Sequence, residues 1–196
     1  MKILLTASGL AALSMSAQAA LINFDAVTPT ATVDGFYNGG TDSLGGSGPN
    51  YGVYFGPAGT WQVLGGYGET SEPFFAYSAT GTSYVDVNPG FTSLSFTYGA
   101  FSPTTVSIFS GLDGTGSLLA SSLLPADDPY AFSPASLSFS GTAYSVVVSG
   151  VSSQFGWDDV NLAIAPEPST YLAGALTLLP IGLQSIRRLR KPRQQS

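Results

Sequence analysis

The sequence contains no cysteine and no histidine. The absence of cysteine excludes disulfides, thiol nucleophiles and thiolate metal ligands. The absence of histidine excludes Ser-His-Asp and Cys-His catalysis and removes the commonest zinc ligand. Only 9% of the 196 residues are charged, well below the usual quarter. Any chemistry must therefore come from carboxylates, amides, hydroxyls and aromatic rings.

Basic residues occur only at the two ends of the chain. No Lys or Arg occurs between Ile3 and Ile186, whereas the segment 20–165 carries eleven of the twelve acidic residues. Such a surface repels nucleic acid, whose phosphates need Lys and Arg, so we expect no nucleic-acid partner. The carboxylates of this segment have no basic side chain to pair with. They must be solvated, hydrogen-bonded or bound to a cation.

The first nineteen residues have the three parts of a secretory signal. Lys2 supplies a positive charge, an apolar run follows from Ile3 to Met15, and the small residues Ala17 and Ala19 flank Gln18. This order is typical of an export signal. We predict a signal peptide over residues 1–19, cleavage after Ala19, and one exported folded domain over residues 20–165.

The last 31 residues combine a short motif, an uncharged run over 169–186 and a basic tail over 187–193. As a helix the run would be about 27 Å long, close to the roughly 30 Å of a hydrocarbon core. We therefore predict a transmembrane helix with the basic cluster on the cytoplasmic side. A plain membrane anchor and a processing signal whose tail is removed both fit this order. The motif is Pro166, Glu167 and Pro168, and the basic cluster is Arg187, Arg188, Arg190 and Lys191.

This C-terminal arrangement resembles the PEP-CTERM sorting signal of Gram-negative bacteria. The resemblance covers residues 166–196 and consists of the Pro-Glu-Pro motif, the apolar run and the Arg-rich tail in that order. It implies an exosortase, a membrane cysteine transpeptidase-like enzyme, as a partner. It also implies a cell surface or extracellular matrix rich in exopolysaccharide. In this interpretation the motif is recognised by the partner enzyme and is not catalytic.

The segment between the two signals shows the alternation of half-buried β-strands. Apolar residues recur at every second position in 94–98, 106–108, 146–148 and 160–164, and turn signals such as Asp113–Gly116 separate such runs. We predict an all-β fold, an antiparallel two-sheet sandwich of the jelly-roll kind. The Gly-rich stretch 37–50 has few core residues and is predicted to be a long loop.

The same segment resembles an extracellular domain commonly found ahead of such sorting signals. The resemblance implies a location and a fold, but no activity. The matching pieces are Asn23–Asp25, Asn50–Val53, Gly90–Phe109, Gly111–Gly116 and Phe155–Val160.

Asp25, Asp158 and Asp159 are the candidate metal ligands. Asp25 follows the first predicted strand and the other two begin the last, and these strands are neighbours in lectin-like jelly rolls. Three carboxylates without a basic neighbour would repel one another, and Ca²⁺ would relieve that repulsion through oxygen ligands. The alternative is that Asp158 or Asp159 accepts backbone N–H bonds in a turn.

Trp61 and Tyr67 are the candidate sugar-binding residues. They lie in a Gly-rich stretch with Gln62, Glu69 and Glu72, so we expect their rings to be partly exposed. The alternative is core packing, which is the common fate of aromatic rings in all-β domains.

Hydrolysis of a glycan would need two carboxylates on opposite sides of the scissile bond. The nominal candidates Glu69, Glu72, Asp127 and Asp128 all lie in loop-like sequence. We therefore expect a non-enzymatic structural or adhesive surface protein, with neutral exopolysaccharide and calcium as candidate ligands. A glycan-active hydrolase is the alternative, and an aromatic-lined cleft with two facing carboxylates would distinguish it.

Overall fold

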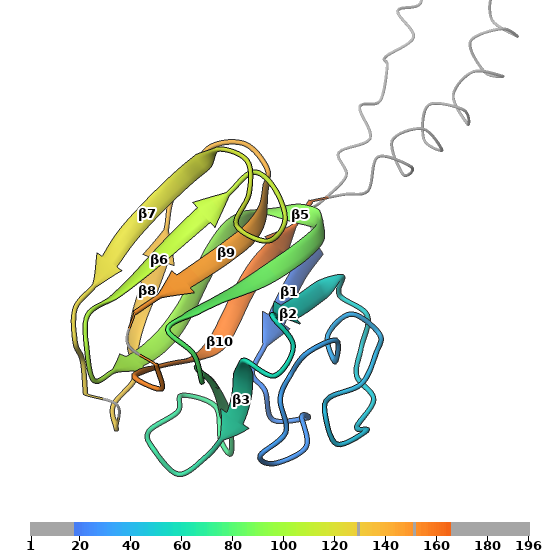
Figure 1. Ribbon diagram of the computed structural model, residues 1–196, viewed down its shortest axis with the longest axis vertical. Coiled ribbons are helices and arrows are strands. Elements are labelled where there is room, and N and C mark those ends of the chain that lie inside the picture. Colours follow the sequence, from blue (N-terminus) through green and yellow to red (C-terminus); the bar gives the residue numbers. More distant parts are fainter. Residues whose placement is uncertain (1–17, 129, 151, 166–196) are drawn as a thin grey trace, which may run out of the picture. The chain divides into compact units, whose positions relative to one another are not determined.

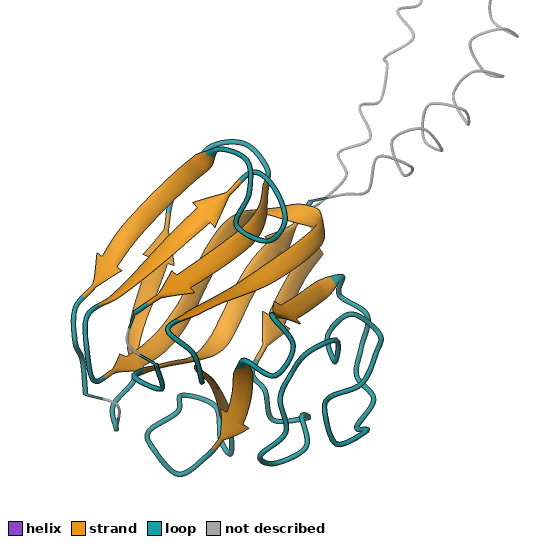
Figure 2. Cartoon of the chain, viewed as in Figure 1, coloured by secondary structure: helices purple, strands orange, loops and turns teal. Residues whose placement is uncertain are grey.

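The computed structural model describes residues 18–128, 130–150 and 152–165. These residues form strands and loops, without a helix (Figure 2). Within these ranges, accordingly, no helix is long and apolar enough to cross a bilayer. The predicted signal peptide, transmembrane helix and sorting motif lie outside the described residues, apart from Gln18 and Ala19.

Ten strands alternate with loops along the described chain (Figure 1). In chain order they are β1 (Gln18–Ile22), β2 (Val53–Gly56), β3 (Trp61–Leu64), β4 (Phe75–Ser78), β5 (Thr82–Ala100), β6 (Thr104–Phe109), β7 (Leu118–Leu124), β8 (Ser133–Leu137), β9 (Ala143–Ser149) and β10 (Phe155–Ile164).

The strands form two antiparallel sheets that share β5. The first sheet has the order β2, β5, β9, β6 and β7, and uses residues 82–87 of β5, with one further pair between Phe91 and Ala143 of β9. In the second sheet, β8 and β10 flank residues 91–100 of β5. Both β1 and β4 pair with the far edge of β10, and β3 pairs with β4. Figure 1 shows the layer of β6, β7 and β9 in front of the layer of β8 and β10.

The passage of β5 from one sheet to the other occurs around Gly90. This residue has φ of +109°, a conformation that glycine adopts without steric cost. A Cβ there would lie 2.6 Å from Thr142 Cγ2 and 2.8 Å from the carbonyl oxygen of Ala143. Gly90 therefore allows one 19-residue strand to serve both sheets.

The inner faces of the two sheets enclose an aromatic core. Trp61 and Trp157 are fully buried, and their rings stack with centroids 4.8 Å apart and an interplanar angle of 14°. Phe55 and Phe96 meet Trp157 edge-on. Alternation builds this core, because successive side chains of a strand point to opposite faces. The buried hydrophobic residues of the described chain run from Ala20 to Leu162, so the segment 20–165 contains a complete core.

The predicted antiparallel two-sheet sandwich is confirmed, and the alternating runs fall in β5, β6, β9 and β10. The first and last strands pair, with Ile22 opposite Val160. Asp113–Gly116 lies in the turn between β6 and β7, and the stretch 37–50 is a loop. Cleavage after Ala19 would shorten β1 to Ala20–Ile22. The finer jelly-roll assignment stays a prediction.

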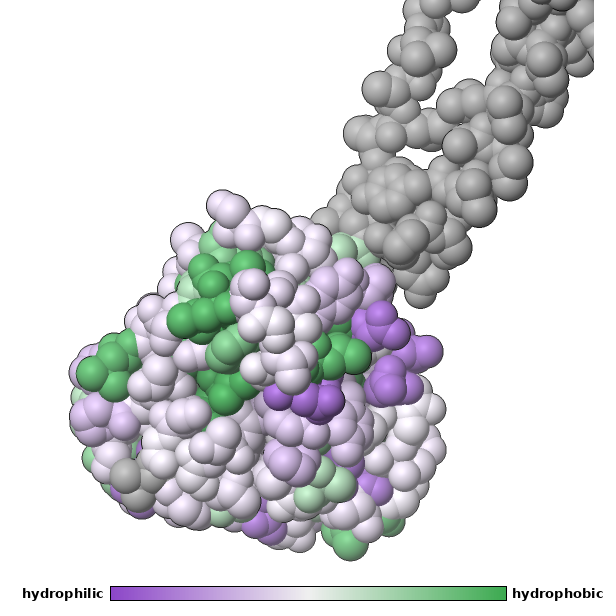
Figure 3. Space-filling model, turned by 45° about the horizontal axis from the view of Figure 1, so that its top comes forward, coloured by the Kyte–Doolittle hydropathy of each residue, from purple (hydrophilic) through white to green (hydrophobic). Residues whose placement is uncertain are grey.

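The surface is weakly polar, as the composition implies. Figure 3 shows a face dominated by pale residues, with green apolar patches and only scattered strongly hydrophilic residues. Among the large apolar side chains, Leu123 on β7 and Tyr130 are more than half exposed. Three of the acidic residues, Asp42, Glu69 and Asp158, are themselves buried and add no charge to this surface.

Candidate functional site

One row of residues crosses the outer face of the second sheet and defines the candidate site. The strand registers place Gln62 of β3 opposite Tyr77 of β4, Tyr77 opposite Gly156 of β10, and Gly156 opposite Gly99 of β5. The hydroxyl of Tyr77 donates a hydrogen bond to Oε1 of Gln62. The last two positions of the row are thus glycines, which have no side chain. The neighbouring inward-facing residues, such as Trp157, are fully buried.

The missing side chain at Gly156 makes room for aromatic rings above the sheet. A Cβ at Gly156 would lie 2.6 Å from Cε2 of Phe75 and 3.5 Å from Cζ of Phe132. The rings of Phe75 and Phe132 meet edge-on at 5.2 Å. The ring of Phe75 therefore packs directly on the backbone of β10 at Gly156. Any larger residue at position 156 would clash with this ring.

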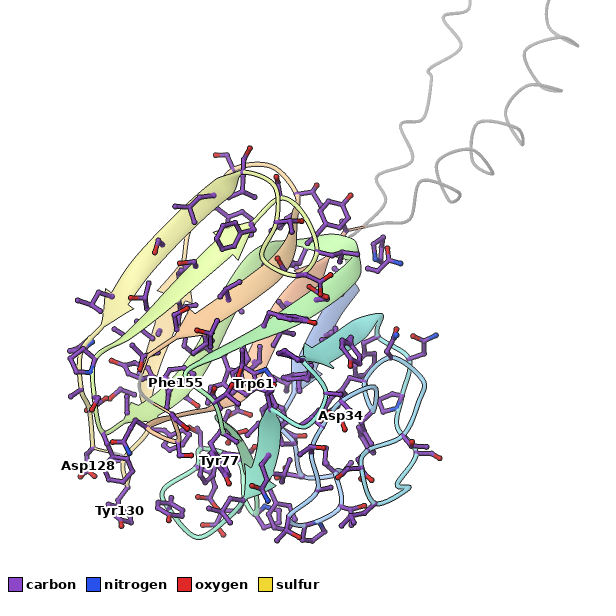
Figure 4. All side chains as sticks on the ribbon, viewed as in Figure 1. Asp34, Trp61, Tyr77, Asp128, Tyr130 and Phe155 are labelled. Carbon is purple, nitrogen blue, oxygen red and sulfur yellow. The ribbon has the colours of Figure 1, made fainter. Side chains whose placement is uncertain are left out.

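These residues line a cleft of about 220 Å³. Figure 4 shows Tyr77 and Tyr130 toward the same end of the sandwich. The cleft is bordered by residues of β3, β4, β5 and β10, and by loop residues on both sides. Its lining residues are Leu64, Tyr67, Phe75, Tyr77, Gly99, Phe101, Phe132, Ser153, Gln154, Phe155 and Gly156.

Two loops build one wall of the cleft. Tyr67 stacks on Tyr130, with ring centroids 5.4 Å apart and an interplanar angle of 13°. The N–H of Phe132 donates to the carbonyl of Gly68 at 3.3 Å, which ties the second loop to the first. Tyr130 is 61% exposed, so the stacked pair extends from the cleft to the surface.

Glu69 holds the loop that carries Tyr67. Its carboxylate accepts hydrogen bonds from the N–H groups of Gly66, Tyr67 and Gly68, at 2.8 to 2.9 Å. Burial alone would raise the pKa of Glu69, but these backbone N–H groups outweigh it and lower the pKa below its usual value. Glu69 therefore stays ionised and acts as a positioning residue for Tyr67.

The opposite rim combines an exposed ring with polar side chains. Phe101 is 51% exposed, and its N–H donates to the carbonyl of Gln154 at 2.8 Å. Ser153 has φ of +58°, a strained conformation for a residue with a Cβ. Its N–H donates to the carbonyl of Ser78 at 2.9 Å, which holds the rim in this conformation. Ser153 and Gln154 are thereby placed at the cleft.

The cleft is electrically neutral in its lining. None of its lining residues, all within the described part of the chain, is acidic or basic. The polar groups of the lining are side-chain hydroxyls, one side-chain amide and backbone N–H and carbonyl groups. Such a lining suits an uncharged ligand with flat apolar faces and a few hydrogen-bonding groups.

Of the two predicted sugar-binding residues, Tyr67 lines this cleft and Trp61 does not. The expectation that Trp61 is partly exposed is wrong: its side chain is 0% exposed and stacks on Trp157 in the core. Its indole N–H donates to the carbonyl of Tyr84 at 3.0 Å. The residue lies on the inner face of β3, where alternation with Gln62 places it, so it presents no ring to a ligand.

Asp158, one of the three predicted metal ligands, is fully buried and hydrogen-bonded. Its carboxylate accepts bonds from the N–H of Ser71 at 2.8 Å, from the hydroxyl of Ser71, and from the N–H of Asp159 at 2.7 Å. Burial raises the pKa of Asp158 to about 6. This is the alternative anticipated for the aspartate pair, in which a carboxylate accepts backbone N–H bonds.

Asp25 and Asp159 lie close enough for their charges to interact. Burial raises the pKa of Asp25, and the charges of Asp159 and Glu69 add to that rise. The carboxylate of Asp25 accepts from Nδ2 of Asn23 at 2.7 Å and from the N–H of Phe74 at 3.3 Å. Within the described residues no group of three or more acidic side chains is arranged to hold a metal ion. Calcium binding therefore stays a prediction.

The other carboxylates considered for hydrolysis are not paired across the cleft. Glu72 and Asp128 are exposed, and a carboxylate oxygen of Asp127 accepts from the N–H of Asp128 at 2.8 Å. Asp128 in turn accepts from the N–H of Tyr130 at 2.9 Å. The carboxylates of Asp127 and Asp128 thus shape the loop that presents Tyr130.

Sequence patterns do not reveal most of the cleft. Nothing in the local sequence marks Phe101 and Phe132, and the glycines at 99 and 156 carry no signal on their own. Their importance comes from the pairing of β5 with β10, which joins residues 57 positions apart. The nearest readable signal is the Phe-Gly-Trp run 155–157, in which a glycine stands between two aromatic residues.

Comparisons with known proteins give weak structural likenesses only. No protein-family model matches the chain, and no curated protein matches it significantly. The module CsCBM6-3 of Clostridium stercorarium, solved with cellobiose, is 18% identical, with 58% of this chain and 86% of that chain covered and a TM-score of 0.35. The C-terminal CBM6 of LamC from Zobellia galactanivorans is 8% identical, covering 74% and 99%, with a TM-score of 0.37.

A third solved structure is a mutant of the family 29 carbohydrate-binding module CBM29-2. It is 11% identical, with 78% of this chain and 99% of that chain covered and a TM-score of 0.39. At TM-scores below 0.5 these resemblances assign neither a family nor a ligand to this chain.

Proposed function

We propose that this protein is a non-enzymatic surface module that binds neutral polysaccharide in the cleft on the second sheet. The observation that carries the proposal is the neutral, aromatic lining, with Tyr67 and Tyr77 on one side and Phe101 on the other. Pyranose rings present flat C–H faces to aromatic rings, and the hydroxyls and the amide of the lining supply hydrogen bonds. A neutral polymer also avoids repulsion by an acidic domain that has no basic residue.

A binding role is favoured over hydrolysis by the positions of the carboxylates. A hydrolase needs an acid and a second carboxylate about 5 to 9.5 Å apart across the bond. The lining contains no carboxylate. The carboxylate of nearby Glu69 accepts hydrogen bonds from three backbone N–H groups. The proposed role is therefore adhesion to, or organisation of, a polysaccharide matrix.

Affinity electrophoresis tests the binding proposal. The protein is run in native gels that contain a neutral glucan, a neutral mannan, neutral glycol chitin or, as an acidic comparison, alginate. We expect at least one neutral polymer to retard the protein and alginate to leave its mobility unchanged. Tyr67→Ala should abolish the retardation. Tyr54→Ala, a change to a half-buried tyrosine of the first sheet, serves as the matched control.

Two results would overturn this proposal. One is unchanged mobility of the protein in every neutral polymer tested. The other is release of new reducing ends from a polymer that retards it, since that would make the protein a hydrolase.

We also propose that the ends of the chain direct it to the cell surface. Export by residues 1–19 and recognition of Pro166–Pro168 by an exosortase are supported by the order of sequence features at the two termini. The C-terminal helix would hold the protein in the membrane until, or unless, the tail is removed. Mass spectrometry of the mature protein from an exosortase-bearing host tests this. We expect a chain that lacks residues 1–19 and the basic tail, and an intact tail in Glu167→Ala.

A further inference from the structure

The cleft is richer in apolar surface than a fully hydroxylated sugar requires. Seven of its eleven lining residues are aromatic or leucine, and two more are glycines. The hydroxyl of Tyr77 is already engaged by Gln62. This leaves the hydroxyls of Tyr67 and Ser153 and the amide of Gln154 as the side-chain groups available to a ligand. Few hydroxyls of a hexose unit in the cleft would find a side-chain partner, so they add less to affinity than its apolar faces do.

The apolar walls instead suit a sugar that carries a methyl-terminated substituent. The half-exposed ring of Phe101 belongs to the same lining as Phe75 and Phe132. A methyl group placed against aromatic rings is removed from water without loss of a hydrogen bond. The glycine pair at 99 and 156 leaves the bottom of the cleft without side chains that would compete for this space.

Gln154 supplies the polar complement to such a substituent. Gln154 lines the cleft and is partly buried, and its side chain makes one long bond of 3.4 Å from Nε2 to the carbonyl of the adjacent Ser153. Among the described residues its Oε1 accepts no side-chain hydrogen bond. A primary amide of this kind can donate to a carbonyl and accept from an N–H at the same time. The acetamido group has one N–H, one carbonyl and a terminal methyl.

We propose that the cleft selects glycans with N-acetylated sugar units, with the acetyl methyl among the aromatic rings and the acetamido group paired with Gln154. This inference rests on the proposed function, because it names the substrate class of the same cleft. The acetamido group is uncharged, so it meets no repulsion from the acidic domain. Its volume, together with part of one pyranose ring, is compatible with a cleft of about 220 Å³.

Isothermal titration of the full chain in mild detergent with two matched oligosaccharides tests this inference. Chitotetraose and cellotetraose share the same β-1,4 backbone and differ at C2, where the first has an acetamido group and the second a hydroxyl. We expect chitotetraose to bind at least about tenfold more tightly. Gln154→Ala should reduce this ratio toward one, and Tyr54→Ala should leave it unchanged.

The possible outcomes distinguish a failure of the N-acetyl preference from a failure of polysaccharide binding itself. Equal binding of the two oligosaccharides, or tighter binding of cellotetraose, overturns the inference while polysaccharide binding stands. An unaltered preference for chitotetraose in Gln154→Ala overturns the pairing with Gln154. Failure of both oligosaccharides and of every neutral polymer in the gel assay removes the proposed function together with this inference.

Discussion

The domain has two aromatic groups that are separated by a single sheet. The tryptophan core, formed by Trp61, Trp157, Phe55 and Phe96, lies between the sheets and is closed to solvent. The cleft lies on the other side of β3, β4 and β10. The same strands build both groups: on β10, Trp157 points inward and its neighbour Gly156 points outward. Aromatic content is therefore no guide to binding, and the face on which a ring lies decides its role.

The largest difference between the tryptophan core and the cleft should be the effect of substitutions on stability. Trp157→Ala removes a fully buried ring that stacks on Trp61, and we expect it to lower the free energy of unfolding by about 3–5 kcal/mol. Phe101→Ala removes a half-exposed ring at the cleft and should cost less than about 1 kcal/mol. Urea denaturation of both variants measures the difference. Similar losses in the two variants would show that the cleft is part of the core.

The pH dependence of stability should be set by a buried carboxylate of β10. Asp158 is fully buried, and its pKa is raised by burial from 3.8 to about 6. Between these values the folded state binds more protons than the unfolded state, so stability falls as pH rises through this window. The penalty above pH 6 is on the order of 3 kcal/mol. The pKa of Asp86 is also raised to about 6, first by burial and then by the charge of Asp113.

Thermal melting between pH 4 and pH 8 measures this effect. We expect the melting temperature to be higher at pH 5 than at pH 7, and Asp158→Asn to flatten the profile. The lowered pKa values of Asp42 and Glu69 have the opposite sign, and their contributions are lost as pH falls below about 4. A melting temperature that rises steadily from pH 5 to pH 8 would contradict the assignment of Asp158.

The two stacked tryptophans should also differ from each other. Nε1 of Trp61 donates to the carbonyl of Tyr84 at 3.0 Å, whereas Nε1 of Trp157 is buried without a hydrogen-bond partner among the described residues. A buried donor without a partner costs about 1–3 kcal/mol. Trp157→Phe should therefore be less destabilising than Trp61→Phe, by roughly 1 kcal/mol or more. Paired urea titrations test this, and an equal or reversed order would point to a partner for Trp157.

The smallest effect is expected at the acidic end of β10. Because the carboxylate of Asp158 is committed to Ser71 and the backbone of Asp159, calcium should change the melting temperature by less than about 2 °C. Melting with calcium and with a chelator measures this. A larger rise with calcium that disappears in both Asp25→Asn and Asp159→Asn would establish the metal site predicted from the sequence.

Local patterns in the sequence were sufficient to predict the sandwich, because alternation and turn residues are encoded over a few positions. Runs such as Leu94–Tyr98 fall in strands with inward apolar side chains. The same local reasoning failed for Trp61, because a Gly-rich neighbourhood does not reveal which face of a strand a ring occupies. The cleft depends on pairing between Gly99 and Gly156 and on a loop contact between Tyr67 and Tyr130. These are long-range contacts that composition and spacing do not encode.

The central claim is that the outer cleft, and not the aromatic core, binds neutral glycan. Its most direct test is titration of the wild-type protein, Tyr67→Ala and Tyr54→Ala with the neutral polymer that retards the protein most strongly. We predict that Tyr67→Ala weakens binding at least about tenfold, with a melting temperature close to that of the wild type. Tyr54→Ala should bind as the wild type does. Unchanged affinity in a folded Tyr67→Ala protein would contradict the claim and place the binding surface elsewhere.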